Sequence, residues 1–412
     1  MSEEEVSESV EPIYQPIGRV TNRTTNTDRT SSIFEKPTYV AILPIIFLFF
    51  FAIFGIAPLS EQVLIDAVCD EMDNDDCDST EVSARAASLN FIAGLALNIP
   101  AVFLCGFFGA LANKYGRKLV IYITLTGFLL YLCIVFYVTT YKPAIYAILV
   151  IGANFIFGLS GGYITFVMGA LCYVSDSTIV IPHTRHTAYS VTEATIFAPQ
   201  VMAPVLSGMW AAVYGYSLPY FVALITCVIN IIYLSFLPES LPMDAECRSK
   251  PLVLDIWQTF RNLSYLFNYK SVEGTSPLPH VAGAFFLYFS AAMGFVATRI
   301  VYFKHEFHFD SGQIGIYGGV EGLVACLSML FAPAAYTAVV GRPLGTIRWI
   351  QVGYFFRAVH WTLFSMMRTG GGVFALLPIL LLVGPIAPYS CPTASRWRNR
   401  PKYFLPFLQL KC

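Results

Sequence analysis

The sequence predicts an all-α membrane protein, and three observations lead to this fold class. Of 412 residues, 56% are hydrophobic and only 12% are charged, which is about half the charged share of soluble domains. Apolar stretches of about 20 residues, long enough for a helix to cross a bilayer, recur along the chain. The chain also holds 29 Gly and 24 Pro, which transmembrane bundles tolerate. The expected surroundings are therefore a lipid bilayer, and a net charge of -1 gives no support to a nucleic-acid partner.

Apolar stretches predict about ten transmembrane helices. They cover residues 39-59, 90-112, 119-138, 145-174, 187-213, 217-236, 281-301, 313-340, 349-367 and 373-390. The polar segment 1-38 is rich in Glu, Ser and Thr and is expected to be a disordered tail. Most Lys and Arg residues lie in the loops on the side of this tail, so the positive-inside rule places the N-terminus in the cytosol. The expected location is the plasma membrane or an endosomal or vacuolar membrane.

The longest loop between predicted spans, 237-279, divides the chain into two parts and is expected to be cytosolic. A bundle of six helices, 39-236, precedes it, and a bundle of four helices, 280-390, follows it. The basic segment 391-412 forms a C-terminal tail. Transporters built from two repeats often join their halves in this way. A second half that repeats the first needs two more helices, so the C-terminal bundle is expected to be incomplete.

The loop between the second and third predicted spans carries the pattern GALANKYGRK, which begins at Gly109. Gly109 is expected to let two helices approach closely, and Gly116 to give the backbone freedom at a tight turn. Lys114, Arg117 and Lys118 are expected to face the anionic inner leaflet and to cap the C-terminus of a neighbouring helix. The simpler interpretation is an ordinary basic loop.

This pattern resembles the major facilitator superfamily signature G-x-L-a-D-r-x-G-R-K, which lies between the same two spans. The resemblance implies two bundles of six helices, of which about ten helices are present here, and secondary transport of a small solute. In the family the motif latches the two halves in one state. Asn113 stands at the position of the usual Asp, so the charge of that latch is lost, while a hydrogen bond can still form.

Further segments are similar to proton-coupled folate transporter-like carriers and to tetracycline-resistance-type facilitators. They are CYVSDST from 172, SVTEA from 190, SGMW from 207 and PESL from 238. The fifth span adds APVLSG, with Pro204 and Gly208, which resembles the helix bend of antiporter-like facilitators; a generic proline kink is the alternative. The resemblance implies transport driven by an ion gradient and leaves the substrate open.

Glu193 lies about 9 Å into the fifth predicted span at 1.5 Å per residue. The resemblance implies proton coupling here, because the folate-carrier relatives use a Glu of the fifth span for that purpose. A carboxylate can bind a proton while it faces one side of the membrane and release it on the other as its desolvation changes. The alternative is a hydrated Glu near the membrane interface.

Charged residues inside the membrane each cost at least about 2.5 kcal/mol, so each needs a partner or a function. Glu321 and Arg357 lie in the middle of the eighth and ninth spans, and an ion pair between them is expected; a role in substrate binding is the alternative. His360, one helical turn after Arg357, either extends this network or only packs. Arg299 is expected to extend towards the outer surface.

The ten Cys residues lack the spacing of a metal site. Cys69 and Cys77 lie in the predicted outer loop 60-86, where an oxidising compartment permits a disulfide; two free thiols are the alternative. Nucleotide-binding, hydrolase and metal motifs are absent from the sequence, so no metal, no cofactor and no enzymatic activity are predicted.

Together these observations predict a secondary active transporter of a small solute that is coupled to protons. The alternative is a non-transporting or truncated membrane protein of the same type, such as an isoform, a scaffold or an incomplete gene product. In a fold of two repeats, the eleventh helix is the structural equivalent of the fifth and would line the central cavity. A form that ends after ten helices is therefore expected to be poorly active.

Overall fold

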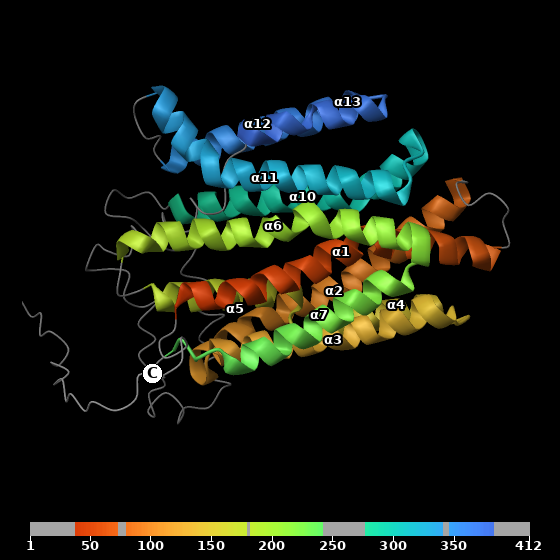
Figure 1. The fold of residues 1–412 in the computed structure, drawn as a ribbon, viewed down its shortest axis with the longest axis horizontal. Helices are drawn as coiled ribbons and strands as arrows, with labels where there is room; N and C mark the ends of the chain where they lie inside the picture. Colours follow the sequence, from red (N-terminus) through yellow and green to blue (C-terminus); the bar gives the residue numbers. More distant parts are fainter. Residues whose placement is uncertain (1–37, 73–79, 179–181, 242–276, 341–345, 383–412) are drawn as a thin grey trace, which may run out of the picture.

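The computed structural model describes residues 38–72, 80–178, 182–241, 277–340 and 346–382. Every regular element in these ranges is a helix (Figure 1). The predicted C-terminal tail, nearly all of the predicted N-terminal tail and most of the predicted central loop lie outside the described residues.

Seven helices form the N-terminal part of the described chain. They are α1 Tyr39–Met72, α2 Thr80–Tyr115, α3 Arg117–Tyr141, α4 Tyr146–Leu159, α5 Gly162–Ser177, α6 Pro182–Tyr214 and α7 Ser217–Phe236. The C-terminal part holds α10 Pro277–Phe307, α11 Ser311–Val340, α12 Thr346–Met366, α13 Gly370–Ala375 and the short 3-10 helix η1 Leu377–Leu382.

Hydropathy located the membrane spans of the first half well. Six described segments are long and apolar enough to cross a membrane, with α4 and α5 taken together as one. In the second half, α10, α11 and α12 have 31, 30 and 21 residues, and about 20 residues suffice to cross the hydrocarbon core. The total of ten spans stays a prediction.

The first helix extends well beyond its apolar stretch. The apolar stretch predicts a span that ends at residue 59 and an outer loop over 60-86, but α1 continues to Met72 and α2 already begins at Thr80. Buried residues such as Leu64, Val68 and Cys69 lie in the extension. Acidic residues between them lower the mean hydropathy of this stretch. Hydropathy alone therefore misses this part of the helix, although it packs against other elements.

The fourth predicted span is broken into α4 and α5. Gly161 and Gly162 adopt φ angles of 90° and 58°, in the left-handed region that favours glycine. A Cβ on Gly161 would collide with the Thr165 side chain. Two consecutive residues in this conformation interrupt the helical hydrogen bonds, so the chain crosses as two shorter helices.

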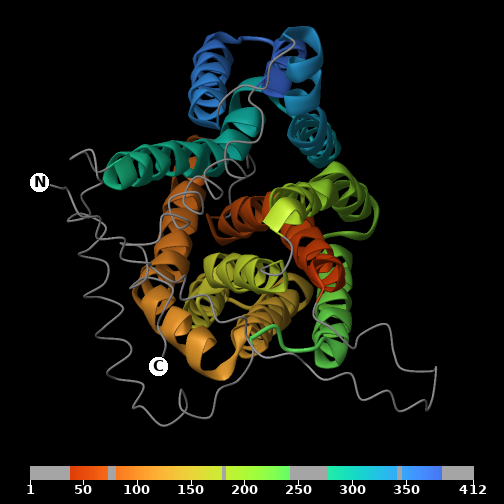
Figure 2. The ribbon, with the colours of Figure 1, turned by 90° about the vertical axis from the view of Figure 1, so that its left-hand side faces the viewer.

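Viewed along the helices, the molecule has two sides (Figure 2). Helices α10 to α13 lie on one side and α2 to α5 with α7 on the other, while α1 and α6 lie between them. The most extensive contact between any two elements joins α6 to α11. A Cβ on Gly319 of α11 would lie 2.6 Å from the Val201 carbonyl oxygen of α6. Glycine therefore lets the two backbones touch where the halves meet.

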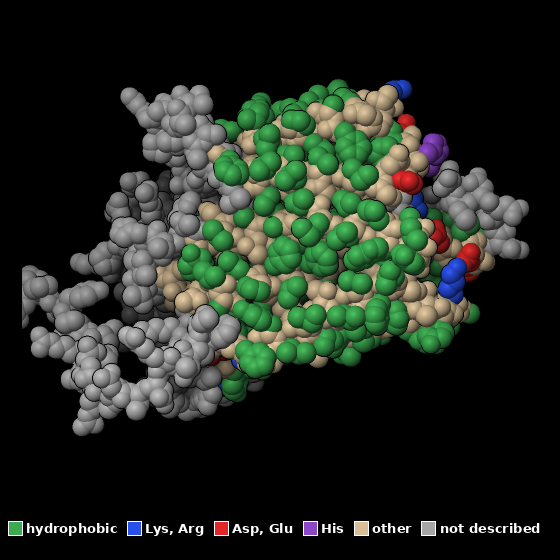
Figure 3. Space-filling model, viewed as in Figure 1, with side chains coloured by type: hydrophobic (Ala, Val, Ile, Leu, Met, Phe, Trp, Pro, Cys, Tyr) green, Lys and Arg blue, Asp and Glu red, His purple; other side chains and the backbone are tan. Residues whose placement is uncertain are grey.

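Each half has its own buried core. In the first half, Phe49 of α1 stacks on Phe166 of α5 with ring centroids 3.7 Å apart. In the second, Phe303 of α10 meets the Tyr317 ring of α11 edge-on at 4.8 Å. The surface is apolar as well. In Figure 3, hydrophobic side chains cover the middle of the molecule, and the visible charged side chains lie mainly at one end. This band suits contact with lipid tails.

Candidate functional site

The loop motif lies at one end of the bundle, where α2 ends and α3 begins; we call this end the motif end. Gly116 joins the two helices with a φ of 106°, which glycine adopts readily. A Cβ at this position would collide with the carboxylate of Glu239. The predicted need for glycine at the turn is therefore matched by a second requirement, the close approach of an acidic side chain.

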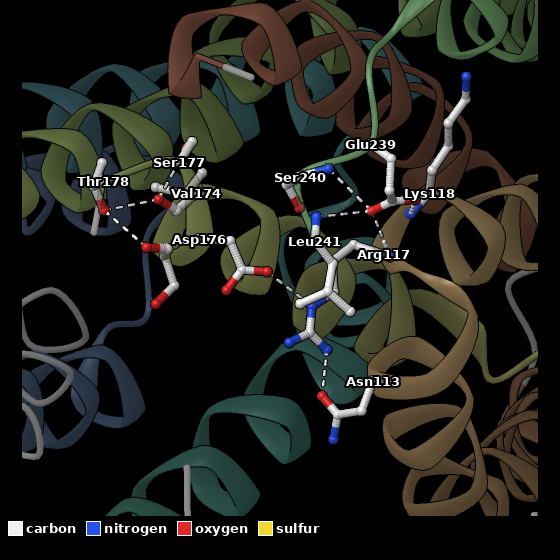
Figure 4. Close-up of polar contacts among 11 residues, drawn as sticks. Asn113, Arg117, Lys118, Val174, Asp176, Ser177, Thr178, Glu239, Ser240 and Leu241 are labelled. Atoms are coloured by element: carbon white, nitrogen blue, oxygen red, sulfur yellow. Dashed lines mark hydrogen bonds and ion pairs between the residues drawn. The ribbon is translucent and has the colours of Figure 1, made fainter. Parts of the chain in front are cut away.

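Glu239 caps the start of α3. Its Oε1 accepts a hydrogen bond from the backbone N–H of Arg117 at 2.9 Å, and its Oε2 accepts one from the N–H of Lys118 at 3.2 Å. Figure 4 shows the carboxylate facing these two residues from the segment that follows α7. The first N–H groups of a helix have no partner within the helix, and the helix dipole favours a negative charge there. In the sequence, Glu239 is visible only as part of the segment PESL, which does not predict this role.

The Arg117 side chain joins two other helices. Its Nε lies 3.0 Å from Asp176 Oδ2 at the end of α5, and its Nη1 donates to Asn113 Oδ1 at 2.7 Å (Figure 4). The hydrogen bond that Asn113 could still form is thus present, and Asp176 supplies a carboxylate for an ion pair. Every described hydrogen-bond or ion-pair partner of Arg117 belongs to the first half of the chain.

The basic residues of the motif are more buried than the sequence suggested. Arg117 and Lys114 are 9% and 7% exposed, so the expectation that they face the inner leaflet is wrong for both. Lys118 does cap a helix, because its Nζ donates to the carbonyl oxygens of Ser235 and Leu237 at the end of α7, each at 2.8 Å.

Gly109 does not provide the expected close approach of helices. A Cβ at this position would lie 3.9 Å from Met168 Sδ, which is ordinary van der Waals contact. Close approach instead occurs at Gly158, where a Cβ would collide with the Leu97 carbonyl oxygen.

A second candidate cluster lies inside the membrane-spanning part. Glu321 of α11 forms an ion pair with Arg299 of α10, with side chains 11% and 12% exposed. The expected pair with Arg357 is not the one present, and Arg299 does not extend to the surface. The reason is helix rotation: α10 turns Arg299 inwards, between the rings of Phe295 and Tyr317, whose centroids lie 5.8 and 5.4 Å from its Cζ.

Arg357 and His360 of α12 complete the cluster without hydrogen bonds to it. Arg357 stands over the Trp361 ring at 5.6 Å, and its buried Nε has no hydrogen-bond partner among the described residues. His360 is 0% exposed, and its ring contacts Phe295 and Phe364. The ring interacts with the backbone of Leu376 and electrostatically with Glu321, but among the described residues it makes no hydrogen bond to the charged side chains of the cluster.

Two polar groups of the first half reach this cluster. Gln200 Nε2 of α6 donates a long hydrogen bond of 3.5 Å to Glu321 Oε2. Glu61 of α1 interacts electrostatically with Arg299. The cluster therefore spans both halves of the molecule. Hydropathy predicts a loop at Glu61, so the sequence gives no sign that this residue reaches the cluster.

Glu193, the predicted proton-coupling residue, lies within α6, which packs against both α1 and α11. Its Oε2 is buried and, within the described part of the chain, accepts no hydrogen bond. It does not join the Arg299 cluster. One carboxylate oxygen is thus withdrawn from solvent, while the residue as a whole is half-buried.

The predicted bend residues and the predicted disulfide fall at defined places. Pro204 lies inside α6 against α11, with its Cβ 3.4 Å from the place of a Cβ on Gly318. Gly208 is buried in the next turn. Cys69 is disulfide-bonded; its predicted partner Cys77 lies outside the described residues.

Comparison with known proteins agrees with this architecture. The family model described as Major Facilitator Superfamily matches residues 42–395. Hippocampus abundant transcript-like protein 1 from Homo sapiens is 24% identical over 278 residues, which are 66% of this chain and 51% of that protein. The Bos taurus protein of the same name is 24% identical over 60% of this chain and 46% of its own length. The chain thus spans about half the length of these curated relatives.

Solved structures share the fold. The human organic anion transporter MFSD10 superposes with a TM-score of 0.62 at 18% identity, over 86% of this chain and 85% of that one. A peptide transporter, POT, gives 0.54 at 13% identity over 89% and 86%, and a D-xylose-proton symporter gives 0.52 at 15% over 84% and 78%. At these identities the likeness concerns the fold.

Proposed function

The chain belongs to the major facilitator superfamily, and from this premise we propose that it carries a small solute across the membrane by secondary active transport coupled to protons. The observation that supports this most directly is the polar cluster between the two halves of a lipid-embedded bundle. Ionisable groups in such a place are costly and serve substrate or ion pathways in membrane proteins. No enzymatic activity is part of the proposal.

Glu193 is the proposed proton-coupling residue. Its Oε2 is buried and lacks a described hydrogen-bond partner, while the residue as a whole is half-buried, and Glu193 lies in the helix that forms the main contact between the halves. A proton is the smallest partner that can neutralise such a carboxylate. When the halves move, a change in its surroundings would release the proton.

The motif end is proposed to be cytosolic, and the membrane to be the plasma membrane or an endosomal or vacuolar one. The excess of Lys and Arg in the loops at this end supports the orientation. A tag inserted at residue 260 should be protected from a membrane-impermeant label in intact cells, and a tag at residue 75 should be labelled. The reverse pattern would contradict the orientation.

The test of transport uses purified full-length protein in liposomes that contain a pH-sensitive dye. A panel of small solutes is added outside, and a coupled carrier changes the internal pH only with its own solute. Glu193→Gln should abolish this proton movement while solute exchange at equal pH persists.

Glu306→Gln is the control, because Glu306 is exposed at the other end of the molecule. Solute uptake with unchanged proton movement in Glu193→Gln would exclude this residue; no solute flux for any compound would count against transport itself.

A further inference from the structure

Glu61 is a carboxylate of the first half that lacks a full set of partners. It lies in α1, about 16 Å along the helix from the end at Met72. Its Oε1 accepts a hydrogen bond from Asn90 Nδ2 of α2 at 3.3 Å. Its Oε2 is buried and accepts no hydrogen bond from any described residue. An ionised carboxylate buried in this way is costly, so its second oxygen needs a cation or a proton.

A cation lies across the interface between the two halves. Arg299 of α10 interacts electrostatically with Glu61, and α1 contacts both α10 and α11. In this structure, however, the guanidinium Nη1 is bonded to Glu321 Oε2. Arg299 is therefore bonded to a carboxylate of its own half and lies within electrostatic range of a carboxylate of the other half.

A cavity lies near Glu61 within the first half. It has a volume of about 180 Å³, and Ser60, Asn90, Asn154 and Tyr220 are among its lining residues, whereas Glu61 itself does not line it. The Tyr220 hydroxyl is buried and meets no described hydrogen-bond partner. The lining is mostly apolar with a few polar side chains, and a cavity of this size has room for water beside them. Asn90 lines the cavity and also donates to Glu61, so it connects the cavity to this carboxylate.

We propose that Glu61 is a proton-binding site and that Glu61 and Glu321 use Arg299 as their cation in turn. This deepens the proton coupling proposed above and rests on it. In the arrangement seen here, Arg299 pairs with Glu321 and the proton resides on Glu61. In the other, Arg299 pairs with ionised Glu61 and Glu321 carries a proton. Each arrangement holds one proton and one ion pair, so the exchange moves a proton from one half to the other without a net change of charge.

Other groups face these three side chains and shape the exchange. Among the described residues they are Lys304 of α10 near Glu61, Tyr317 of α11 near Arg299, and Arg357 and His360 of α12 near Glu321. The helices α2 and α6 contribute neutral amides, Asn90 and Gln200. Lys304 thus lies near Glu61 and Arg357 near Glu321. Each positive side chain offsets part of the energetic cost of leaving that carboxylate ionised when Arg299 pairs with the other one.

The test measures heat stability of the purified full-length chain, so it needs no substrate. Glu61→Gln, Glu321→Gln and the double variant are heated, and the monodisperse fraction gives an apparent Tm. If the two carboxylates replace one another as partners of Arg299, each single change leaves one partner. The double change leaves none, and a buried, unpaired charge is strongly destabilising. The Tm loss of the double variant should exceed the sum of the single losses by about 3 °C or more.

The matched control combines Glu321→Gln with Glu71→Gln. Glu71 lies in the same helix as Glu61, but its described partners are Arg85 and Tyr146, so these two losses should add. Additive losses for the Glu61 and Glu321 pair as well would overturn the proposal.

Infrared spectroscopy tests the position of the proton separately. The band of protonated carboxyl groups should lose one component in Glu61→Gln. It should also lose that component in Glu321→Gln, where Arg299 becomes available to Glu61 and the proton leaves. A band unchanged in Glu61→Gln would contradict a proton on this residue. Both measurements can fail while transport persists, which separates this proposal from the proposed function.

Discussion

Arg117 at the start of α3 and Asp176 at the end of α5 form an ion pair of 3.0 Å with side chains only 11% and 16% exposed. The pair therefore links the motif turn to the end of α5, which the chain reaches after it has passed through α3 and α4. Asp176→Asn would leave Arg117 buried with only the neutral Asn113 and backbone groups around its guanidinium. Loss of one partner from a largely buried pair should cost about 2 to 4 kcal/mol, measured as reduced heat stability of the purified protein.

The control for this variant is Asp70→Asn. Asp70 pairs with Lys142 at the same distance of 3.0 Å, but these side chains are 63% and 75% exposed. Exposed pairs contribute less than about 1 kcal/mol. Equal losses for the two variants would show that the Arg117 pair is not a structural element of the motif end.

The turn glycine provides a second prediction. Gly116 and Gly215 both have positive φ angles, 106° and 77°, so alanine at either position costs about 1 to 3 kcal/mol of backbone strain. A Cβ at Gly215 meets no atom within 4 Å, whereas one at Gly116 strikes Glu239. Gly116→Ala should therefore also displace Glu239 from the start of α3, and it should destabilise the protein by about 1 kcal/mol more than Gly215→Ala does. The difference between the two apparent Tm values measures this, and equal values would argue against the cap.

In the first half, the sequence predicted the segments that are apolar enough to cross the membrane but not where their helices end. An apolar run such as the first one reports the lipid-facing part of a helix. The extension of α1 to Met72 buries Leu64, Val68 and Cys69 but also carries acidic residues, of which Asp70 and Glu71 are exposed. The break between α4 and α5 could be suspected from Gly161 and Gly162, yet the same pair also suits close helix packing.

The intramembrane pairing illustrates a different limit. Depth along the helices predicts similar levels for Glu321 and Arg357. What decides a partner is the rotation of each helix about its axis, which packing in the whole bundle sets. In α10 that rotation turns Arg299 inwards, and its neighbours in the sequence give no periodic signal strong enough to predict it. Glu239 and Asp176 were equally hard to assign, because the fold alone brings them to Arg117.

The corrected ion pair makes a third prediction. Arg299→Gln leaves Glu321 without its charged partner, so adding Glu321→Gln to this variant should restore part of the lost stability. Adding Glu321→Gln to Arg357→Gln should restore none, because Arg357 makes no hydrogen bond to Glu321 in the described structure. The stranded charge accounts for about 3 to 5 kcal/mol. Recovery with Arg357 instead of Arg299 would mean that the pair expected from depth is the correct one.

The last prediction concerns the contact between the two halves at α6 and α11. Replacing an exposed or loosely packed glycine in a helix by alanine stabilises the protein by about 0.5 to 1 kcal/mol. Gly152 of α4 meets that description, because a Cβ there has no neighbour within 4 Å.

A Cβ on Gly319, in contrast, would lie 2.6 Å from the Val201 carbonyl oxygen, a backbone atom that cannot rotate away. Gly319→Ala should therefore push α6 and α11 apart and destabilise the protein by about 1 to 3 kcal/mol, whereas Gly152→Ala should be neutral or slightly stabilising. Heating both purified variants gives the comparison. Because Gln200 reaches Glu321 from α6 across this contact, the displacement should also weaken that 3.5 Å hydrogen bond. If Gly319→Ala proves as stable as Gly152→Ala, the two halves do not meet backbone to backbone at this point.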